Sequence, residues 1–169
     1  NNITKSLDDV IFETQVELGT LKRKYKANLQ KELSVARVNK RKNVKSTKNY
    51  SKIGVAYYSL LVIDGAEKRI NDIASTRDLS VCMNSLASVL YTINGLGGKI
   101  EKPQTKRMIN EAEKLGKGSE GEEKELAKML GSMKDMTVGS GKEKLDISSL
   151  VSVDVIERLI NDDPVEVVI

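Results

Sequence analysis

Apolar side chains recur at steps of three and four residues through the first hundred residues of this chain, and no proline interrupts them before Pro103. Such steps place side chains on one side of an α-helix, and proline is the residue that most strongly breaks a helix. The pattern therefore predicts long amphipathic helices. The first is expected over residues 3–38, with these apolar positions on one stripe: Leu7, Val10, Ile11, Leu18, Leu21, Tyr25, Leu29 and Leu33.

A second segment, residues 50–94, keeps the helical spacing apart from one phase slip near Arg77. As a single helix it would be about 65 Å long. The link between the two segments, residues 39–49, has Val44 as its one apolar residue, and we expect either a turn or a polar continuation of a helix. Two long apolar stripes joined by a short link most simply bury each other as an antiparallel hairpin.

In the rest of the chain, glycines mark the expected helix ends and linkers. The stretch "NGLGG", residues 94–98, predicts the end of the second helix. Beyond it we expect short helices over residues 104–115, 122–136 and 148–161, glycine-rich linkers between them, and an extended end over residues 165–169. The predicted fold class is all-α, a long antiparallel helical hairpin with shorter C-terminal helices packed on it. Residues 1–98 would form the basic hairpin and residues 99–169 the short helices and acidic segment of one structural domain.

Charge is distributed very unevenly along the chain, although the net charge is only +4. Residues 20–52 contain twelve Lys or Arg and one acid, Glu32, which gives +11. Residues 143–169 contain seven acids against Lys144 and Arg158, which gives −5. Such asymmetry predicts an anionic partner for the first region and an internal contact between the two.

The cations are the candidate binding residues. We expect the first four to lie on the outer face of the first helix and the others to form the adjoining tip of the hairpin. The candidate residues for binding a membrane or another polyanion are Lys22, Arg23, Lys24, Lys26, Arg37, Lys40, Arg41, Lys42, Lys45, Lys48 and Lys52.

An anionic membrane is the expected partner, because each base near such a surface contributes roughly 1 kcal/mol. Nucleic acid is the alternative, since phosphates would attract the same cations. Of the tyrosines that could stack on bases, Tyr50, Tyr57 and Tyr58, at most one is expected to be free. A second alternative is a helical protein that docks another protein and makes no use of the charge asymmetry.

Residues that carry catalysis are scarce. The chain has no His, which removes most triads and imidazole metal sites. The stretch "DMTVGSGKEK" departs from the P-loop pattern at Met136 and Glu143, and the lone Cys82 lies in an apolar helical pattern that indicates a core thiol. We therefore expect no enzymatic activity, no cofactor, no metal and no small-molecule substrate.

The longest apolar stretch, residues 55–63, is far shorter than the roughly 20 residues that span a bilayer. No segment reads as a signal peptide, so we expect a cytoplasmic protein that associates peripherally with membranes. Met129, Met133 and Met136 recur at helical spacing. They are expected to fill a packing gap, with an adaptable docking surface as the alternative.

Three features of the layout occur together: a basic first helix, a second helix beginning near "ARVNKRKN" (36–43), and the stretch "LSVCMNSLASVLYTINGL" (79–96). This layout resembles the ESCRT-III family, and the last stretch is similar to the end of that family's long second helix. The resemblance covers roughly residues 5–136. It implies a hairpin that polymerises side by side, binds acidic membranes through basic helical residues, and is held closed by its acidic C-terminal part.

The stretch "VDVIERLINDD" (153–163) resembles the tail motif through which that family recruits its disassembling ATPase. Arg158 and Leu159 match the Arg-Leu pair of that motif and are the candidate partner-binding residues. Asp162 stands where the motif has Leu. Gly19, Gly54 and Gly65 interrupt helices that are usually poor in glycine in that family.

Overall fold

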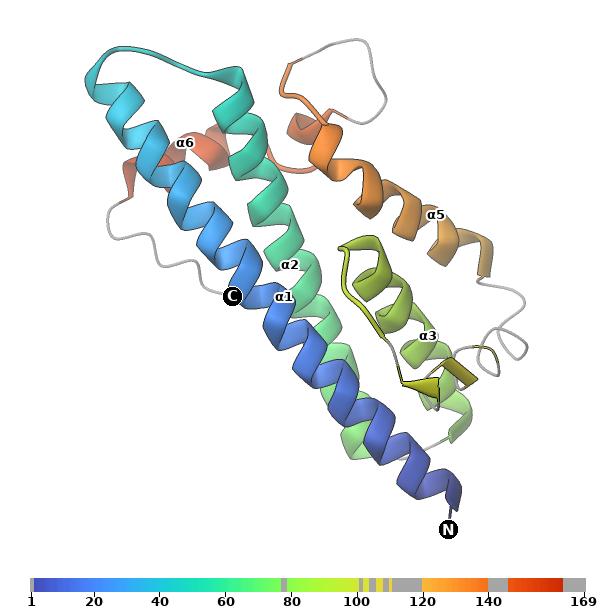
Figure 1. Ribbon diagram of the computed structural model, residues 1–169. Helices are drawn as coiled ribbons and strands as arrows, with labels where there is room; N and C mark the ends of the chain where they lie inside the picture. The colour runs from blue at the N-terminus through green and yellow to red at the C-terminus, as the bar shows by residue number, and fades with distance from the viewer. Residues whose placement is uncertain are drawn as a thin grey trace. The chain divides into compact units, whose positions relative to one another are not determined.

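Two long helices, α1 (Asn2–Arg41) and α2 (Thr47–Thr76), run antiparallel in the computed structural model (Figure 1). They are followed by α3 (Leu79–Gly95), α5 (Glu120–Ser132), the 3-10 turns η1 (Met133–Asp135) and η2 (Ile147–Ser149), and α6 (Val153–Asn161). The structure describes residues 2–76, 79–100, 102, 103, 106, 107, 110, 120–139 and 146–162, and this part of the chain contains no strand. The all-α fold and its hairpin are confirmed.

Specific hydrogen bonds at the hairpin turn end α1 and begin α2. Asn43 has φ 56°, and the amides of Asn43 and Val44 donate to the carbonyls of Lys40 and Asn39 at 3.0 and 2.9 Å. This pair of bonds is the Schellman motif, with Asn in the left-handed position that Gly usually takes. Ser46 then caps α2, because its Oγ accepts from the amide of Asn49 at 3.2 Å.

The second long helix is shorter than predicted, and this is a correction. The expected helix over residues 50–94 is two helices, since α2 ends at Thr76 and α3 begins at Leu79. The chain reverses between them: Cys82 Sγ donates to the carbonyl of Ile73 at 3.6 Å, and Arg69 donates to Ser88 at 2.5 Å. The phase slip in the sequence falls between the end of α2 and the start of α3. The apolar stripe after the slip points to a different side, so it could not face α1 if α2 continued as one straight helix. Because α3 folds back instead, this stripe is buried.

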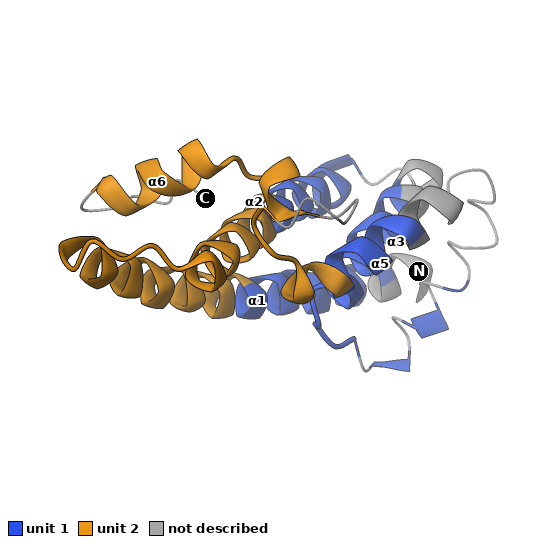
Figure 2. Ribbon diagram, turned by 90° about the horizontal axis from the view of Figure 1, so that it is seen from above, with its two compact units in different colours: residues 1–21, 62–131 blue, residues 22–61, 132–169 orange. Residues whose placement is uncertain are grey.

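The fold divides into two compact units (Figure 2). Unit 1 comprises residues 1–21 and 62–131, and unit 2 comprises residues 22–61 and 132–169. Each unit therefore draws on both sides of residue 98, where the sequence predicts a division.

Unit 1 packs α3 and α5 with the first half of α1 and the second half of α2. Gly95 allows α5 to approach α3, because a Cβ on Gly95 would lie 2.9 Å from both the carbonyl oxygen of Ala127 and Cβ of Leu130. The buried apolar residues of unit 1 are Leu7, Val10, Ile11, Leu18, Leu21, Ile63, Ala66, Ile70, Ile73, Cys82, Leu86, Ala87, Val89, Leu90, Ile93, Leu96 and Leu130.

Unit 2 packs the second half of α1, the first half of α2 and α6. The last helix begins five residues later than predicted, because Ser152 caps it at Val153 through a bond from the amide of Val155. The helix predicted over residues 104–115, apart from residues 106, 107 and 110, and the extended end at residues 165–169 lie outside the described residues.

Candidate functional site

All eleven candidate cations lie in unit 2, on the second half of α1, in the turn, and in the first two turns of α2. The only acid between residues 22 and 52, Glu32, is half-buried and accepts two bonds from Asn49 Nδ2, at its carbonyl (2.9 Å) and at Oε1 (3.1 Å). The exposed residues of this stretch therefore include no acid.

The first four cations do not share one outer face, contrary to the prediction. Successive residues of a helix point about 100° apart, so a run of neighbours points to several sides. Arg23 and Lys24 are exposed, whereas Lys22 and Lys26 are half-buried. Lys24 also lies over the ring of Tyr25, 5.4 Å from its centroid.

Arg37 binds the C-terminal end of α6. Its Nε donates to the carbonyl of Ile160 at 3.0 Å, and its Nη2 donates to the carbonyls of Leu159 and Asp162 at 3.3 and 3.0 Å. The last carbonyls of a helix have no partner within the helix, and a cation there also complements the helix dipole. Arg37 therefore fixes α6 on α1.

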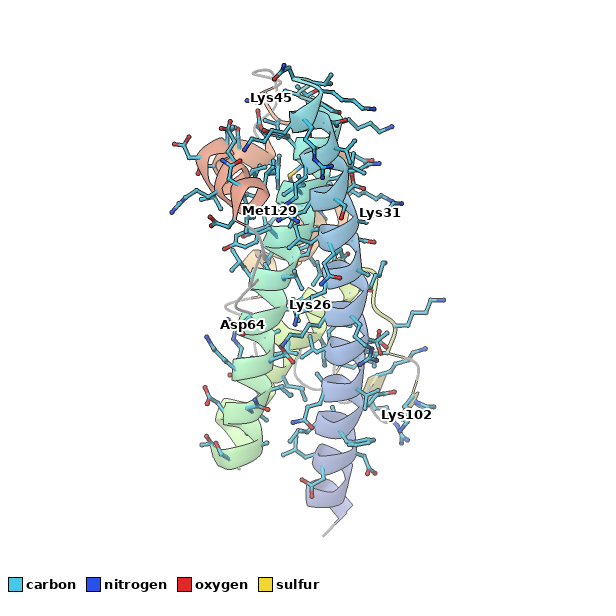
Figure 3. The ribbon with its side chains drawn as sticks, turned by 90° about the vertical axis from the view of Figure 1, so that its left-hand side faces the viewer. Lys26, Lys31, Lys45, Asp64, Lys102 and Met129 are labelled. Carbon is cyan, nitrogen blue, oxygen red and sulfur yellow. The ribbon has the colours of Figure 1, made fainter. Side chains whose placement is uncertain are left out.

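Two further cations meet α6. Lys40 donates to Asn161 Oδ1, and Lys45 forms an ion pair with Glu157 at 3.2 Å. Figure 3 shows Lys45 at the turn end of the hairpin, and its Nζ lies 5.0 Å from the ring centroid of Tyr50. The side chains of Lys45 and Glu157 remain 59% and 44% exposed, so the pair contributes at most about 1 kcal/mol.

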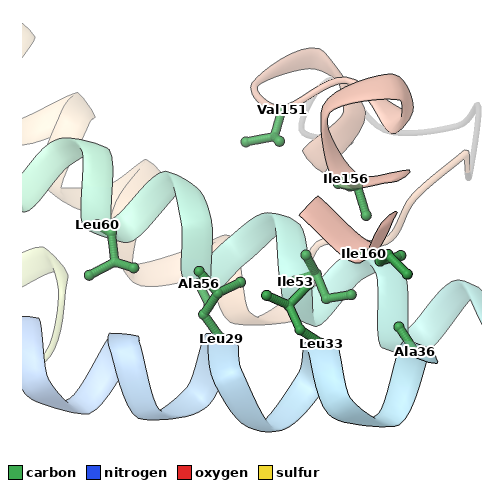
Figure 4. Close-up of a cluster of buried hydrophobic side chains, with 9 residues drawn as sticks. All are labelled: Leu29, Leu33, Ala36, Ile53, Ala56, Leu60, Val151, Ile156 and Ile160. Carbon is green, nitrogen blue, oxygen red and sulfur yellow. The ribbon is translucent and has the colours of Figure 1, made fainter. Parts of the chain in front are cut away.

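Apolar packing holds α6 more strongly than this ion pair. Ile156 and Ile160 point from α6 toward Ile53 and Ala36 (Figure 4). Both isoleucines are at most 5% exposed, and burying an Ile side chain contributes about 1.5–3 kcal/mol. The whole cluster comprises Leu29, Leu33, Ala36, Ile53, Ala56, Leu60, Val151, Ile156 and Ile160.

The two candidate partner-binding residues differ in exposure. Arg158 is exposed, whereas Leu159 packs partly buried against the unit 2 cluster and its carbonyl accepts from Arg37. Asp162, where the ATPase-recruiting motif has Leu, donates its amide to the carbonyl of Arg158 at 2.8 Å.

The remaining cations of the tip face solvent. Arg41, Lys42, Lys48 and Lys52 are exposed, and their side chains make no hydrogen bond or ion pair with any described residue. The predicted basic tip thus consists of two sets, one bound to α6 and one that makes no such bond with the described residues.

The tyrosines are part of the packing. Tyr50, Tyr57 and Tyr58 are partly buried against the unit 2 cluster. Burial raises the pKa of Tyr50 above 10.0, the Glu157 carboxylate raises it further, and Lys45 opposes the shift. Burial also raises the pKa of Tyr25, against a smaller lowering by its hydrogen bond with Ser59. No one of the three candidate stacking tyrosines is fully exposed.

A pocket of about 240 Å³ lies between the turn and α6. Its cations, Lys40 and Lys45, are bound to α6, and the buried Oδ1 of Asn49 has no hydrogen-bond partner among the described residues. The lining residues are Ala36, Asn39, Lys40, Asn43, Val44, Lys45, Ser46, Asn49, Tyr50, Glu157, Ile160 and Asn161.

The described ranges contain no cluster of three or more Cys, Asp or Glu that could hold a metal ion. No described helix has the length and apolarity that crossing a membrane requires. Cys82 is fully buried, as predicted for a core thiol, and Met133 and Met136 are buried in the packing.

The sequence reasoning missed the α6 residues that bind the cations, Glu157 and Asn161. It also missed Val35 and Val38, which are exposed on α1 although apolar. The helical spacing in the sequence could have predicted their exposure, because both valines fall outside the buried stripe of Leu29, Leu33 and Ala36.

Comparisons of the chain with protein-family models, with curated proteins and with solved structures each gave no match. The resemblance to the ESCRT-III family therefore stays a prediction from the sequence.

Proposed function

We propose that the protein is a non-enzymatic, all-helical assembly protein that binds anionic membrane surfaces through the cations of unit 2 and self-associates, as the ESCRT-III resemblance implies. One observation carries the proposal: the exposed part of residues 22–52 holds many Lys and Arg and no acid. Exposed cations repel one another, and an anionic surface would offset that repulsion. The protein would then act as a peripheral membrane protein in the cytoplasm.

Self-association draws support from unit 1. Phe12 and Val16 lie four residues apart on α1 and are 64% and 53% exposed. Residues four apart are neighbours on a helix surface, so the two side chains form a small apolar patch that a second copy could cover.

Regulation by the acidic segment is the third part of the proposal. Arg37, Lys40 and Lys45 bind α6, so releasing α6 would leave three more cations without their bonds to α6 and available to an external anion. Deletion of residues 143–169 should therefore increase binding to phosphatidylserine vesicles. The variant Ile160→Ser, which loosens α6 without changing any charge, should act in the same direction. Unchanged binding of both variants would contradict the regulation, and an increase confined to the deletion would assign the effect to net charge.

Sedimentation tests the membrane function directly. The full chain should sediment with phosphatidylserine vesicles at low salt and lose this binding as salt rises. It should not sediment with vesicles of phosphatidylcholine alone. Retention by RNA in the same salt series, without vesicle binding, would favour the nucleic-acid alternative instead.

Electron microscopy with and without acidic vesicles tests assembly. Filaments are expected, and discrete monomers in both conditions would oppose self-association.

A further inference from the structure

One side of α1 in unit 2 combines exposed valines with lysines. Lys31, Val35 and Val38 of α1 and Lys42, the residue directly after α1, are spaced four, three and four residues apart. This spacing continues a single stripe about 17 Å long. We call these four residues the outer stripe. Val35 and Val38 are 41% and 42% exposed, and Val44 in the following turn is 54% exposed.

The outer stripe faces away from the core and from α6. Leu29, Leu33 and Ala36 mark the buried side of α1, and Arg37 and Lys40 reach α6 from positions beside it. The stripe lies on the opposite side, and Lys31 points away from α2 (Figure 3). Its lysines make no hydrogen bond or ion pair with any described residue, so the stripe is open while α6 is bound.

We infer that the outer stripe is the face that enters an anionic lipid surface, with Val35 and Val38 at the acyl boundary and Lys31 and Lys42 at the phosphates. The inference rests on the proposed function and adds to it which face docks and how deep it goes. A helix lying in the interface buries its apolar side about 5–10 Å into the headgroup region and keeps cations at the polar boundary. The stripe has this composition, with apolar residues in the middle and a lysine at each end.

Other occupants fit the stripe less well. Nucleic-acid phosphates would pair with the lysines but would leave both valines in water, without the apolar contact that burial provides. A second copy docking through the same stripe would bring lysines against lysines, which repel each other. Of these three occupants, an anionic surface with an apolar layer beneath it satisfies both kinds of side chain.

The chain contains no Trp, so a single indole can report the depth of this face. Val38→Trp and Leu61→Trp form a matched pair, since Leu61 is an apolar residue of α2 in the same unit with 43% exposure. With phosphatidylserine vesicles carrying brominated acyl chains, the indole at position 38 should be quenched and the one at position 61 should not. Quenching at both positions or at neither, with the protein bound to vesicles, would overturn the inference and leave the proposed function standing.

A second pair of variants tests affinity. Val35→Ser with Val38→Ser should weaken binding to phosphatidylserine vesicles about tenfold, because two partly inserted side chains lose apolar burial. Retention by RNA should not change, since every charge is kept. Equal loss for vesicles and RNA, or no loss for vesicles, would overturn the inference. Failure of the unaltered chain to bind phosphatidylserine vesicles at low salt would remove the proposed function and this inference together.

Discussion

Arg37 shows how a single residue of a basic run differs from its neighbours. It donates to three carbonyls at the end of α6, whereas Arg41, four residues later on the same helix, is exposed. Both are arginines on α1 of unit 2, so only their surroundings distinguish them. One positions an element and the other is available to an external anion.

Arg37→Ala should therefore lower the free energy of unfolding by about 1–3 kcal/mol, because three carbonyls lose a charged donor. Arg41→Ala should change it by less than about 0.5 kcal/mol, as expected for an exposed side chain. Urea denaturation followed by circular dichroism measures both. Equal effects of the two variants would mean that the bonds of Arg37 contribute nothing to stability.

Tyr50 allows the contact between the turn and α6 to be followed by titration. Its pKa is raised first by burial and then by the Glu157 carboxylate, so Glu157→Gln should lower that pKa toward 10.0. The pKa of Tyr25, raised by burial and not by Glu157, should stay unchanged. NMR of ring-labelled tyrosine resolves the two titration midpoints. An unchanged pKa of Tyr50 would show that Glu157 is not near its ring in solution.

The same shift has a consequence for stability. A folded-state pKa above the unfolded value means that the neutral phenol is compatible with folding and that its ionisation opposes folding. The stability that depends on the neutral tyrosines is therefore fully present below about pH 10. It is lost as pH rises through the folded-state pKa values of Tyr25 and Tyr50.

Among the elements, α3 and α5 depend on a close approach that only a small residue permits. Gly95→Ala should lower the free energy of unfolding by about 1–3 kcal/mol, because the new Cβ would lie 2.9 Å from backbone of α5. Gly65→Ala is the matched control, since nothing lies within 4 Å of its Cβ position and Ala favours the helix. It should raise stability by up to about 1 kcal/mol. Thermal melts compare them, and the same sign for both would refute the close-packing explanation.

Element by element, the spacing of apolar residues predicted α1 closely, because one continuous stripe needs one continuous helix. It did not predict the break between Thr76 and Leu79. A phase slip in the stripe is compatible with a longer curved helix or with a reversal, and only packing against α1 and α2 decides between them. The start of α6 was misplaced for a similar reason, since Ser148, Ser149 and Ser152 are all plausible caps.

The candidate site was predicted only as a stretch of sequence. Residues 37–52 were expected to form one basic tip, whereas Arg37 and Lys45 bind residues of α6 more than 100 positions away. Spacing within a helix gives the side on which a cation lies but not which distant element covers that side. The exposed valines of the outer stripe could have been read from the helical period alone.

At the scale of the whole molecule, charge repulsion competes with a few ion pairs. Salt weakens both, so the sign of the salt effect on stability shows which is larger. Twelve cations against one acid in residues 20–52 should outweigh the partly exposed Lys45–Glu157 pair. Stability should therefore rise with salt.

Raising KCl from 0.01 M to 0.1 M shortens the Debye length from about 30 Å to about 10 Å, which largely screens exposed cations that lie more than about 10 Å apart. We expect the midpoint of thermal unfolding to rise in this range, and scanning calorimetry measures it. A variant with Lys31→Gln, Lys42→Gln and Lys48→Gln should melt higher at 0.01 M and respond less to salt, because three exposed cations are gone. A midpoint that falls with salt in the unaltered chain would mean that neighbouring acids already neutralise the basic region, and the need for an external anion would disappear with it.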